Sequence, residues 1–432
     1  MYFIRDILIK ILQWQATVVL WRYKPQIIVI TGSIGKTSTK DAIFNVLSQF
    51  AYVRKSQKNF NNDIGVPLTI LGLSTGWRNP LKWIANVIKA FGLILLPFMK
   101  YPKWLVLEVG IRKPGDMEEL KRWVKPNMVV VSAFGTMPSH VEFFEDKYGV
   151  WKEEAAIIDA MDSNGTLLLN HDDLEVMKLA ENSKHRTYTF GVHEDATIEM
   201  GHNEIDYHPE HIEAKGTIFR IDYEGKSIPV HIHGFLGNNV VYASGAALLV
   251  AHVMKLPMVK ATEGLASGEF PAGRMRIIEG VKQTMIIDDT YNSSPSAVEN
   301  ALEVLHGLRT LGRKIAVLGD MFDLGKHTDE EHRKMGEFAA SRCDKLITVG
   351  IRARNTAKAA IDAGMNEKDV VMFDDSQVAG KFVEEKISKG DVVLVKGSQG
   401  ARMERAVVEI MAHPELRETL VVRQEEEWVS KE

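Results

Sequence analysis

Short apolar runs alternate with longer stretches of helical periodicity along most of this chain. Apolar runs of four or five residues, bounded by turn residues, are typical of buried parallel strands separated by helices. In the first half of the sequence they occupy residues 27–30, 104–107, 128–131 and 166–169. From about His185 to Phe235 the pattern changes to short alternating segments, which predicts an antiparallel part of the sheet. A helix is expected from Asn239 to about Lys255.

A change of composition between Ala266 and Gly273 predicts a linker, after which a second alternating unit begins. Its apolar runs occupy residues 285–287, 315–318, 346–349 and 392–395. The predicted fold class is therefore α/β, with a central domain on a mostly parallel sheet and a C-terminal Rossmann-like α/β domain. The expected bounds are 26–268 for the central domain and 269–432 for the C-terminal domain.

Two further segments are unusually apolar for a soluble protein. Residues 1–25 predict an amphipathic helix, because five aliphatic residues follow the spacing of one helical face: Ile4, Ile7, Leu8, Ile11 and Leu12. The second segment, 77–104, is an apolar insert with lysines at 82, 89, 100 and 103 and tryptophans near both ends. This composition suits a helix at a membrane surface, and it equally suits helices that pack on the domain or on each other.

The strand at 27–30 runs into the sequence Thr31-Gly32-Ser33-Ile34-Gly35-Lys36-Thr37, and a helical stretch begins near Ser38. A strand, a glycine-rich turn and a helix start in this order predict a phosphate-binding loop, here in a shortened GxxGKT form. The Lys36 side chain would reach the β- and γ-phosphates, and the Thr37 hydroxyl would ligate Mg²⁺. The central domain is thus predicted to be a P-loop ATPase domain. The expected nucleotide contacts in the loop are Gly32, Ser33, Ile34, Gly35, Lys36, Thr37 and Ser38.

Composition narrows the possible partners and location. The 432 residues carry 53 basic and 57 acidic side chains, so the net charge of −4 gives no electrostatic footprint for nucleic acid. The single Cys343 excludes an internal disulfide and fits a reducing compartment. No apolar stretch approaches the roughly 20 residues that span a bilayer. A cytoplasmic location is expected, with the inner face of the membrane as the alternative.

Polar clusters follow the P-loop in an order that resembles the Mur ligase family. They stand at residues 59–67, 108–110, 140–142, 270–274, 288–292, 317–321 and 395–398. The resemblance covers roughly residues 26–412. It implies ATP-dependent peptide ligation in peptidoglycan precursor synthesis, in which ATP phosphorylates a carboxylate and the amine of an amino acid or dipeptide attacks the acyl phosphate. The implied cofactors are ATP and Mg²⁺.

The resemblance also implies two metal positions. Thr37 and Glu108 would hold the first Mg²⁺, and His140 matches the ligand of a second. The family places a carbamylated lysine in the helix after that histidine, but Glu154 stands at the corresponding position, with Lys152 matching a neighbouring lysine. A glutamate could supply the carboxylate without CO₂. The alternative is that Glu154 is a surface helix residue.

In the C-terminal domain, Arg274 resembles the family arginine that crosses to the ATP phosphates, and Asp289 matches the aspartate at the ribose. Asn239 resembles an asparagine near the adenine, although its neighbours Asn238 and Tyr242 depart from the family pattern. The expected catalytic residues are Lys36, His140, Glu154 and Arg274. Two roles are possible for Lys396, His332 and Arg402. They could contact the substrate, or they could form salt bridges at the surface.

Only about 25 residues precede the P-loop strand, too few for the separate domain that grips the UDP end of the substrate in such ligases. The carboxylate acceptor could then be a small molecule held by the 77–104 insert or by a protein partner, or it could be linked to a lipid at the membrane. Three alternative functions stay open. They are another amide ligase of the superfamily, such as a folate-polyglutamate type, an ATP-binding subunit of an amidotransferase, and a P-loop regulatory switch.

Overall fold

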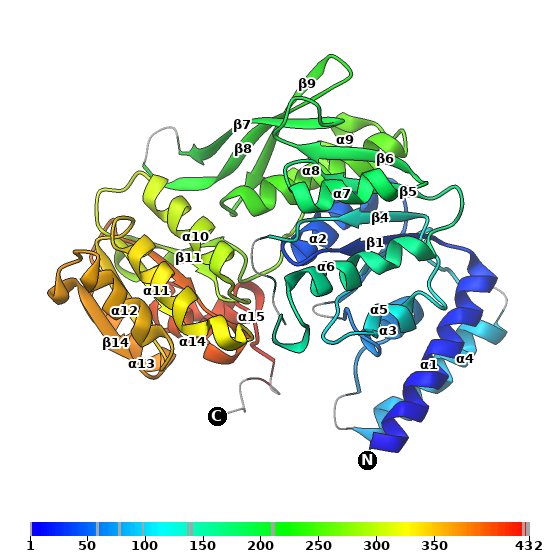
Figure 1. Cartoon of the computed structure of the whole chain (residues 1–432), viewed down its shortest axis with the longest axis horizontal. Coiled ribbons are helices and arrows are strands. Elements are labelled where there is room, and N and C mark those ends of the chain that lie inside the picture. Colours follow the sequence, from blue (N-terminus) through cyan, green and yellow to red (C-terminus); the bar gives the residue numbers. More distant parts are fainter. Residues whose placement is uncertain are drawn as a thin grey trace.

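A large twisted sheet forms the centre of the first domain in the computed structural model (Figure 1). The structure describes residues 2–57, 60–76, 79–96, 99–135, 138, 141–208, 212–425 and 428. Within these residues the sheet has nine strands in the order β2-β3-β1-β4-β5-β6-β7-β8-β9. The strands are β1 (Gln26–Thr31), β2 (Val53–Lys55), β3 (Trp104–Glu108), β4 (Met128–Val131), β5 (Thr166–Asn170), β6 (Arg186–Gly191), β7 (Ile198–Tyr207), β8 (Ala214–Tyr223) and β9 (Lys226–His233).

The strands from β2 to β7 pair in parallel, and only β7, β8 and β9 pair antiparallel. The four apolar runs predicted as parallel strands are confirmed as β1, β3, β4 and β5. The prediction of antiparallel pairing throughout 185–235 is wrong for β6. Helix α7 (Leu174–Asn182) connects β5 to β6, and such a crossover brings the next strand back in parallel.

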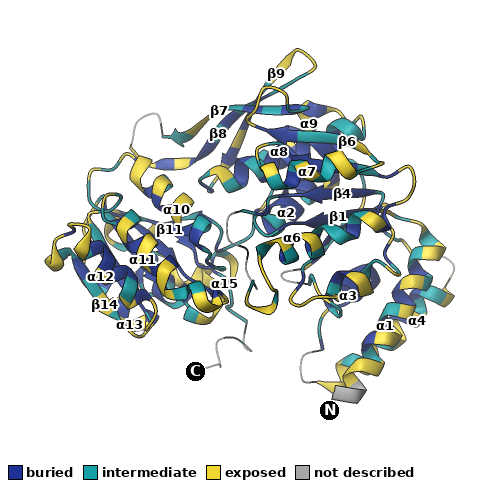
Figure 2. Ribbon diagram, viewed as in Figure 1, coloured by how far each residue is buried: buried dark blue, intermediate teal, exposed yellow. Residues whose placement is uncertain are grey.

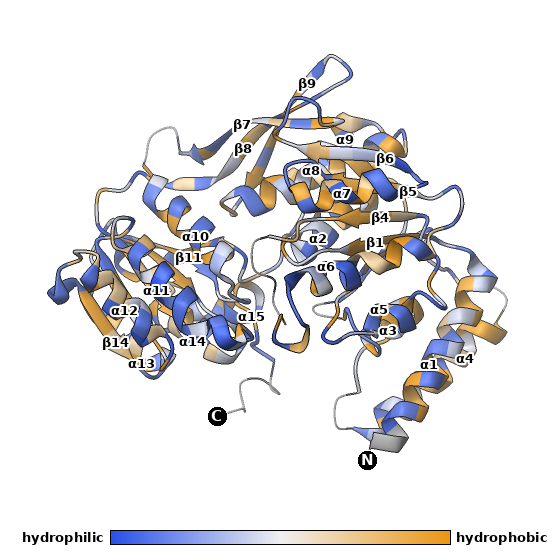
Figure 3. Cartoon of the chain, in the orientation of Figure 1, coloured by the Kyte–Doolittle hydropathy of each residue, from blue (hydrophilic) through white to orange (hydrophobic). Residues whose placement is uncertain are grey.

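Helices cover both faces of this sheet because the apolar strand residues alternate between two cores. In β1, Ile28 and Ile30 face the layer of α2 (Lys36–Ser48), α8 (Asn238–Val253) and α9 (Met258–Ser267). Ile27 and Val29 face the opposite layer. That layer contains α1 (Tyr2–Tyr23), α3 (Gly65–Leu71), α4 (Pro80–Leu95), α5 (Asp116–Leu120), α6 (Lys147–Ala155) and α7. Buried strands between half-exposed helices are visible in Figure 2, and the apolar character of the strands in Figure 3.

The second domain has its own sheet, in the order β10-β11-β15-β12-β13-β14. Only β10 and β11 pair antiparallel. The strands are β10 (Arg276–Gly280), β11 (Thr284–Asp289), β12 (Lys314–Gly319), β13 (Lys345–Val349), β14 (Val370–Phe373) and β15 (Val392–Lys396). Helices α10 (Pro295–Gly307), α11 (Thr328–Ala339) and α12 (Ala353–Asp362) cover one face, and α13 (Ser376–Lys386) and α14 (Glu404–Ile410) the other, before the short α15 (Arg417–Leu420).

The predicted α/β fold class with two parallel-sheet units is confirmed. Helix α9 ends at Ser267 and β10 begins at Arg276, so the proposed boundary at 268/269 lies in the connection between the two sheets. The N-terminal segment forms a helix as expected. In the 77–104 insert, α4 occupies Pro80–Leu95, while residues 77, 78, 97 and 98 lie outside the described part of the chain. None of the helices in that described part is long and apolar enough to cross a bilayer.

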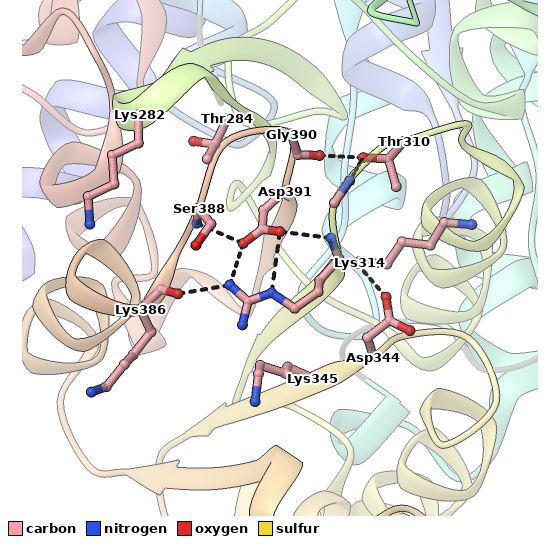
Figure 4. Close-up of polar contacts among 12 residues, drawn as sticks. Lys282, Thr284, Thr310, Lys314, Asp344, Lys345, Lys386, Ser388, Gly390 and Asp391 are labelled. Carbon is pink, nitrogen blue, oxygen red and sulfur yellow. Dashed lines mark hydrogen bonds and ion pairs between the residues drawn. The ribbon is translucent and has the colours of Figure 1, made fainter.

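One buried carboxylate organises the start of two neighbouring strands in the second domain (Figure 4). Asp391, directly before β15, is 2 % exposed and accepts hydrogen bonds from the backbone N–H of Arg313 at 2.7 Å and of Ser388 at 2.9 Å. The Arg313 guanidinium donates to both of its oxygens, at 3.3 and 2.6 Å. Burial alone would raise the pKa of Asp391, but these donors outweigh burial and hold the pKa below its usual value.

We expect Asp391→Ala to lower the free energy of unfolding by about 2–4 kcal/mol, because it leaves buried N–H donors without an acceptor. Chemical denaturation near neutral pH measures this loss. The pKa of Asp391 is lower in the folded protein than in the unfolded chain. The stability that the Asp391 carboxylate provides is therefore complete above its unfolded pKa and is lost as the pH falls through its folded pKa. The difference in unfolding free energy between wild type and variant should shrink in acid. Asp374→Ala is the control, because that 69 % exposed carboxylate pairs with Arg354 at the surface. Equal losses in both variants would contradict the prediction.

Candidate active site

A cavity of about 740 Å³ lies between the two domains and is lined by residues of both. From the first domain it is lined by Ser33, Ile34, Gly35, Lys36, Thr37, Ser38, Glu108, Glu154 and Asn239. From the second domain it is lined by Arg274, Asp289, Tyr291, Asn292, Ser293, Ser294, Ala297 and Lys396. The structure therefore brings together all the predicted nucleotide and metal residues except two. Gly32 belongs to the loop but does not line the cavity, and His140 lies outside the described residues.

The loop between β1 and α2 has the backbone that its glycines predict. Gly32 has φ +116°, and a Cβ there would stand 2.6 Å from Ser132 Oγ, so both conformation and space require glycine. Gly35 has φ +82° and precedes α2 without a side-chain cap. No side chain caps the first N–H groups of α2. The residues of this first turn, Lys36, Thr37 and Ser38, line the cavity. This is the arrangement with which a helix start binds a polyphosphate.

Glu154 contacts the P-loop directly. Its Oε1 lies 3.3 Å from Lys36 Nζ, and its Oε2 accepts a hydrogen bond of 2.7 Å from Ser33 Oγ. The residue belongs to α6 and is 4 % exposed, because the backbone of this turn is tied to β1 by the Thr31 hydroxyl, which donates to the Glu154 carbonyl at 2.8 Å. The alternative that Glu154 is a surface helix residue is wrong.

A second buried carboxylate stands beside the helix start. Glu108, at the end of β3, is 2 % exposed, and its Oε1 accepts hydrogen bonds from Thr37 Oγ1 at 3.2 Å and Asn61 Nδ2 at 3.1 Å. Its Oε2 accepts no hydrogen bond from the described residues, although Lys40 Nζ lies 3.6 Å away. A buried carboxylate oxygen without a hydrogen bond, next to a threonine hydroxyl, fits a hard divalent cation.

The described residues contain no cluster of three His, Cys, Asp or Glu side chains placed to form a metal cage. Mg²⁺ does not need one, because it is usually bound by one or two carboxylates together with substrate phosphates and waters. The Thr37–Glu108 pair and the Glu154 carboxylate therefore fit predicted Mg²⁺ ligands.

Arg274 reaches the cavity from the connection between the domains. Its guanidinium carbon lies 4.2 Å from the centre of the Tyr291 ring, and its Nε has no hydrogen-bond partner among the described residues. Burial raises the pKa of the Tyr291 hydroxyl, with the Glu108 charge adding to the shift. The aromatic ring thus supports a cation at the domain junction.

Asp289 and Lys396 form a buried ion pair across neighbouring strands of the second domain. The two residues are register partners in β11 and β15, and Lys396 Nζ lies 2.6 Å from Asp289 Oδ2 and 3.0 Å from the Asn292 carbonyl. Burial lowers the pKa of Lys396, and the Asp289 carboxylate opposes this shift. Lys396 therefore lies at the cavity wall, where it neutralises and orients Asp289.

His332 and Arg402, for which the sequence left substrate contact or surface salt bridge open, lie within the second domain. His332 is 1 % exposed. Its Nε2 accepts a hydrogen bond of 3.0 Å from the Met321 N–H, and its Nδ1 donates one of 2.7 Å to the Thr328 carbonyl. Arg402 pairs with Glu404 at 2.6 Å and donates to the Trp428 carbonyl. Neither residue lines the cavity. Their polar atoms form hydrogen bonds and ion pairs within the second domain instead.

Arg423 is a residue of the site that the sequence analysis did not find. Its guanidinium donates to the Thr290 carbonyl at 3.0 and 3.1 Å and to the Tyr291 carbonyl at 2.6 Å, and it pairs with Glu404 at 3.4 Å. These contacts fasten the loop after β11, whose Tyr291 supports Arg274. No local motif marks Arg423, which stands 132 residues from Tyr291.

We expect Arg423→Ala to lower kcat/KM for ATP by about tenfold, because the freed loop no longer holds Tyr291 against Arg274. Steady-state kinetics well below the melting temperature measures the effect. Arg417→Ala, an exposed change in α15, is the matched control and should leave kcat/KM unchanged. Unchanged kinetics in Arg423→Ala would show that this tether has no part in ATP use.

A P-loop domain and a Rossmann-like domain that close on one cavity define a two-domain nucleotide-binding enzyme. Family comparison identifies which one. The Mur ligase middle domain matches residues 30–80 and 86–251, and the Mur ligase glutamate ligase domain matches residues 273–399. The chain belongs to the Mur ligase family, whose members are ATP-dependent acid–amino-acid ligases.

Similar proteins cover most of the chain. The UDP-N-acetylmuramoyl-tripeptide–D-alanyl-D-alanine ligase of Bacillus subtilis is 28 % identical over 405 residues, which are 93 % of this chain and 79 % of the relative. The Escherichia coli enzyme of the same name is 26 % identical over 386 residues, covering 88 % and 76 %. The MurF ligase of Thermotoga maritima in complex with ADP superposes with a TM-score of 0.75 at 25 % identity, covering 95 % of this chain and 84 % of that one.

A folylpolyglutamate synthase of Mycobacterium tuberculosis shares the fold at a TM-score of 0.62. Its identity is 12 %, over 92 % of this chain and 94 % of that chain. This similarity concerns the fold alone. The predicted ligase class and ATP use are supported by the MurF relatives, whereas the roles of the individual site residues stay predictions.

Proposed function

We propose that this chain joins D-alanyl-D-alanine to a UDP-N-acetylmuramoyl-tripeptide in peptidoglycan precursor synthesis. The observation that carries the proposal is the cavity between the domains, where the P-loop, two buried carboxylates, Arg274 and the Asp289–Lys396 pair meet. Relatives that bear this ligase name match about nine tenths of the chain. A cytoplasmic location follows as part of the proposal, because ATP and nucleotide-linked precursors are substrates.

The proposed reaction has two steps. A carboxylate oxygen of the tripeptide attacks the γ-phosphorus of ATP, and the bond from this phosphorus to the bridging oxygen of ADP breaks, giving an acyl phosphate and ADP. The amine nitrogen of the dipeptide then attacks the acyl carbon, the bond from this carbon to the phosphate oxygen breaks, and the nitrogen loses a proton. The products are an amide, ADP and inorganic phosphate. Both steps bring anions together, so cations and N–H donors must stabilise the charge.

The P-loop and Arg274 supply that stabilisation from the protein. The first N–H groups of α2 and the Lys36 ammonium would bind the β- and γ-phosphates. Arg274, supported by Tyr291, would contact the phosphates from the other domain, so that transfer requires both domains to be in place. Asp289, held by Lys396, would bind the ribose hydroxyls, and Asn239 at the start of α8 would lie near the adenine.

Thr37, Glu108 and Glu154 would hold Mg²⁺, with His140 as the predicted ligand outside the described residues. Bound Mg²⁺ neutralises phosphate charge and polarises the phosphorus for attack. In the protein alone, the Asn61 amide fixes the Glu108 carboxylate toward Thr37, and Ser33 fixes Glu154 toward Lys36. We propose that Glu154 takes the place of the carbamylated lysine of the family.

The cavity extends past the P-loop toward α1, and we propose that this arm takes the acceptor. Its lining carries three basic residues, Arg5 from α1 with Arg112 and Lys113 from the loop after β3, and three carboxylates, Asp63, Asp116 and Glu119. Arg5 pairs with Asp63 at 3.1 Å. The Asp116 carboxylate accepts the N–H groups of Arg112 and Lys113 at 2.8 and 3.0 Å and so fixes the turn that carries them. The Arg112 and Lys113 side chains would bind the phosphates and carboxylates of the acceptor.

The decisive experiment is a ligation assay with purified protein, ATP, Mg²⁺, UDP-N-acetylmuramoyl-tripeptide and D-alanyl-D-alanine. We expect phosphate release that requires both the acceptor and the dipeptide, and a product mass equal to the two joined with loss of water. Phosphate release only with a lipid-linked acceptor, only with a folate and glutamate, or only with a glutamine-hydrolysing partner would replace the proposal with the corresponding alternative.

A further inference from the structure

Helices α1 and α4 together present a large apolar face to solvent. On α1 the exposed large apolar residues are Ile7, Ile11, Trp14 and Trp21, at spacings of four, three and seven residues. On α4 they are Leu81, Ile84, Ile88, Phe91 and Leu95, at spacings of three or four. These nine residues are called the α1/α4 face. Trp21, Leu81 and Leu95 are each more than 70 % exposed. Exposed apolar side chains gathered in one place mark an interaction site.

The opposite sides of the two helices already account for their packing. Leu12, Ala16 and Val19 of α1, with Ala90 and Leu93 of α4, are buried in the core of the first domain. The helices lie side by side at the edge of the molecule away from the second domain (Figure 1). The α1/α4 face is therefore apolar surface beyond what the fold itself buries.

Side-chain contacts hold α1 and α4, the two helices of the face, in place against each other. Gln15 Nε2 donates to the Val87 carbonyl at 3.0 Å, and Tyr23 Oη donates to the Leu93 carbonyl at 3.0 Å. The Trp14 and Phe91 rings meet across the seam with 6.1 Å between their centres. The face is thus one preformed surface on two parallel helices, and docking would not require the helices to rearrange.

Basic residues surround this face. In the sequence, residues 2–24 and 79–104 contain eight basic side chains and one acidic one, Asp6, a net charge of +7. The whole chain carries −4, so the rest of it carries −11. Lys82 and Lys89 follow Leu81 and Ile88 by one residue each and so lie along one edge, and Lys10 lies beside Ile7 and Ile11 on α1; all three lysines are exposed.

We propose that the α1/α4 face docks this protein on the surface of an anionic lipid bilayer, with both helices lying in the interface. Tryptophans and aliphatic residues would enter the headgroup boundary, and the lysines would contact lipid phosphates. A second copy of the chain fits the face less well, because it would bring together two pairs of segments, 2–24 and 79–104, that each carry a net charge of +7. The inference does not depend on the proposed ligase substrate, since no residue of the face lines the cavity.

Sedimentation with vesicles tests the proposal. The full chain should bind vesicles of phosphatidylcholine with about 30 % phosphatidylglycerol, bind pure phosphatidylcholine vesicles at least about tenfold more weakly, and be released by high salt. Ile84→Glu combined with Ile88→Glu should lower binding by about tenfold or more. Leu311→Glu is the control, since Leu311 is 82 % exposed in the second domain.

The charge component has its own pair of variants. Lys82→Glu combined with Lys89→Glu should weaken binding to the anionic vesicles by about tenfold or more, whereas Lys358→Glu, exposed on α12, should leave binding unchanged. Unaltered ATP hydrolysis and melting temperature show that each variant is folded.

Three results would overturn the proposal. They are no binding to anionic vesicles, equal binding to both vesicle types, and equal binding by the Ile84/Ile88 variant and wild type. Light scattering adds a fourth. A wild-type dimer that the Ile84/Ile88 variant converts to a monomer, without any vesicle binding, would make the face an interface between copies instead. Loss of vesicle binding with intact ligation, or the reverse, separates this proposal from the proposed function.

Discussion

Replacing Lys36 with alanine is expected to lower ATP-dependent turnover by about 10²- to 10³-fold while the fold stays intact. The side chain lies on the cavity wall and is 17 % exposed, so its removal leaves no core cavity. What is lost is the ammonium that we propose binds the phosphates at the start of α2. Turnover, circular dichroism and the melting temperature measure both parts of the prediction.

Lys358→Ala, exposed on α12, is the matched control for loss of one positive charge and should keep wild-type turnover. The variant also leaves Glu154 without its ion-pair partner, so a small fall in melting temperature is expected. Near-normal turnover in Lys36→Ala would remove the P-loop from the mechanism, whatever the rest of the cavity binds.

Glu154→Ala is expected to raise the Mg²⁺ concentration for half-maximal rate by about tenfold, if the carboxylate belongs to the metal site. The wild-type rate should not depend on added bicarbonate, because a glutamate needs no carbamylation. Glu154→Lys carries the family residue. It should be inactive in CO₂-free buffer, where its ammonium would oppose the metal, and should regain activity with bicarbonate. Mg²⁺ titrations with and without bicarbonate measure all three expectations.

Lys152→Ala is the control on the same helix, since Lys152 is exposed two residues away. It should leave the Mg²⁺ dependence unchanged. Wild-type Mg²⁺ dependence in Glu154→Ala would assign this carboxylate to the Lys36 and Ser33 contacts alone, and a bicarbonate requirement in the wild type would place a carbamylated group elsewhere.

The parts of the fold and site that the sequence predicts are those whose signals are local. The P-loop is a contiguous string between a strand and a helix, and its glycines are required by the backbone at Gly32 and Gly35. The buried strands are continuous apolar runs, because helices cover both faces of each sheet. The alternating pattern predicts the wrong pairing direction for β6, because alternation indicates one half-exposed face and not the direction of the neighbouring strand.

The contacts that the sequence could not predict join distant segments. Arg423 fastens Thr290 and Tyr291 through backbone carbonyls, which have no side-chain signature. Asn61 supports Glu108 from a loop 47 residues earlier. The burial of Glu154 depends on how α6 packs against β1, and no pattern within the helix distinguishes it from a surface glutamate. The family resemblance identified Glu108 and Glu154, but the residues that contact them are known only from the structure.

The order of strands in the second sheet also has a consequence for how the protein is made. Strand β15 is the last of that sheet in the chain, yet it lies between β11 and β12. A ribosome therefore releases β11, β12, β13 and β14 before the strand that joins β11 to β12 exists, while all the strands of the first sheet are already available. Lys396 reaches Asp289 only at this final insertion. The nascent chain thus gains its phosphate loop early and its nucleotide pocket late, so premature termination before β15 leaves a P-loop without a ligase.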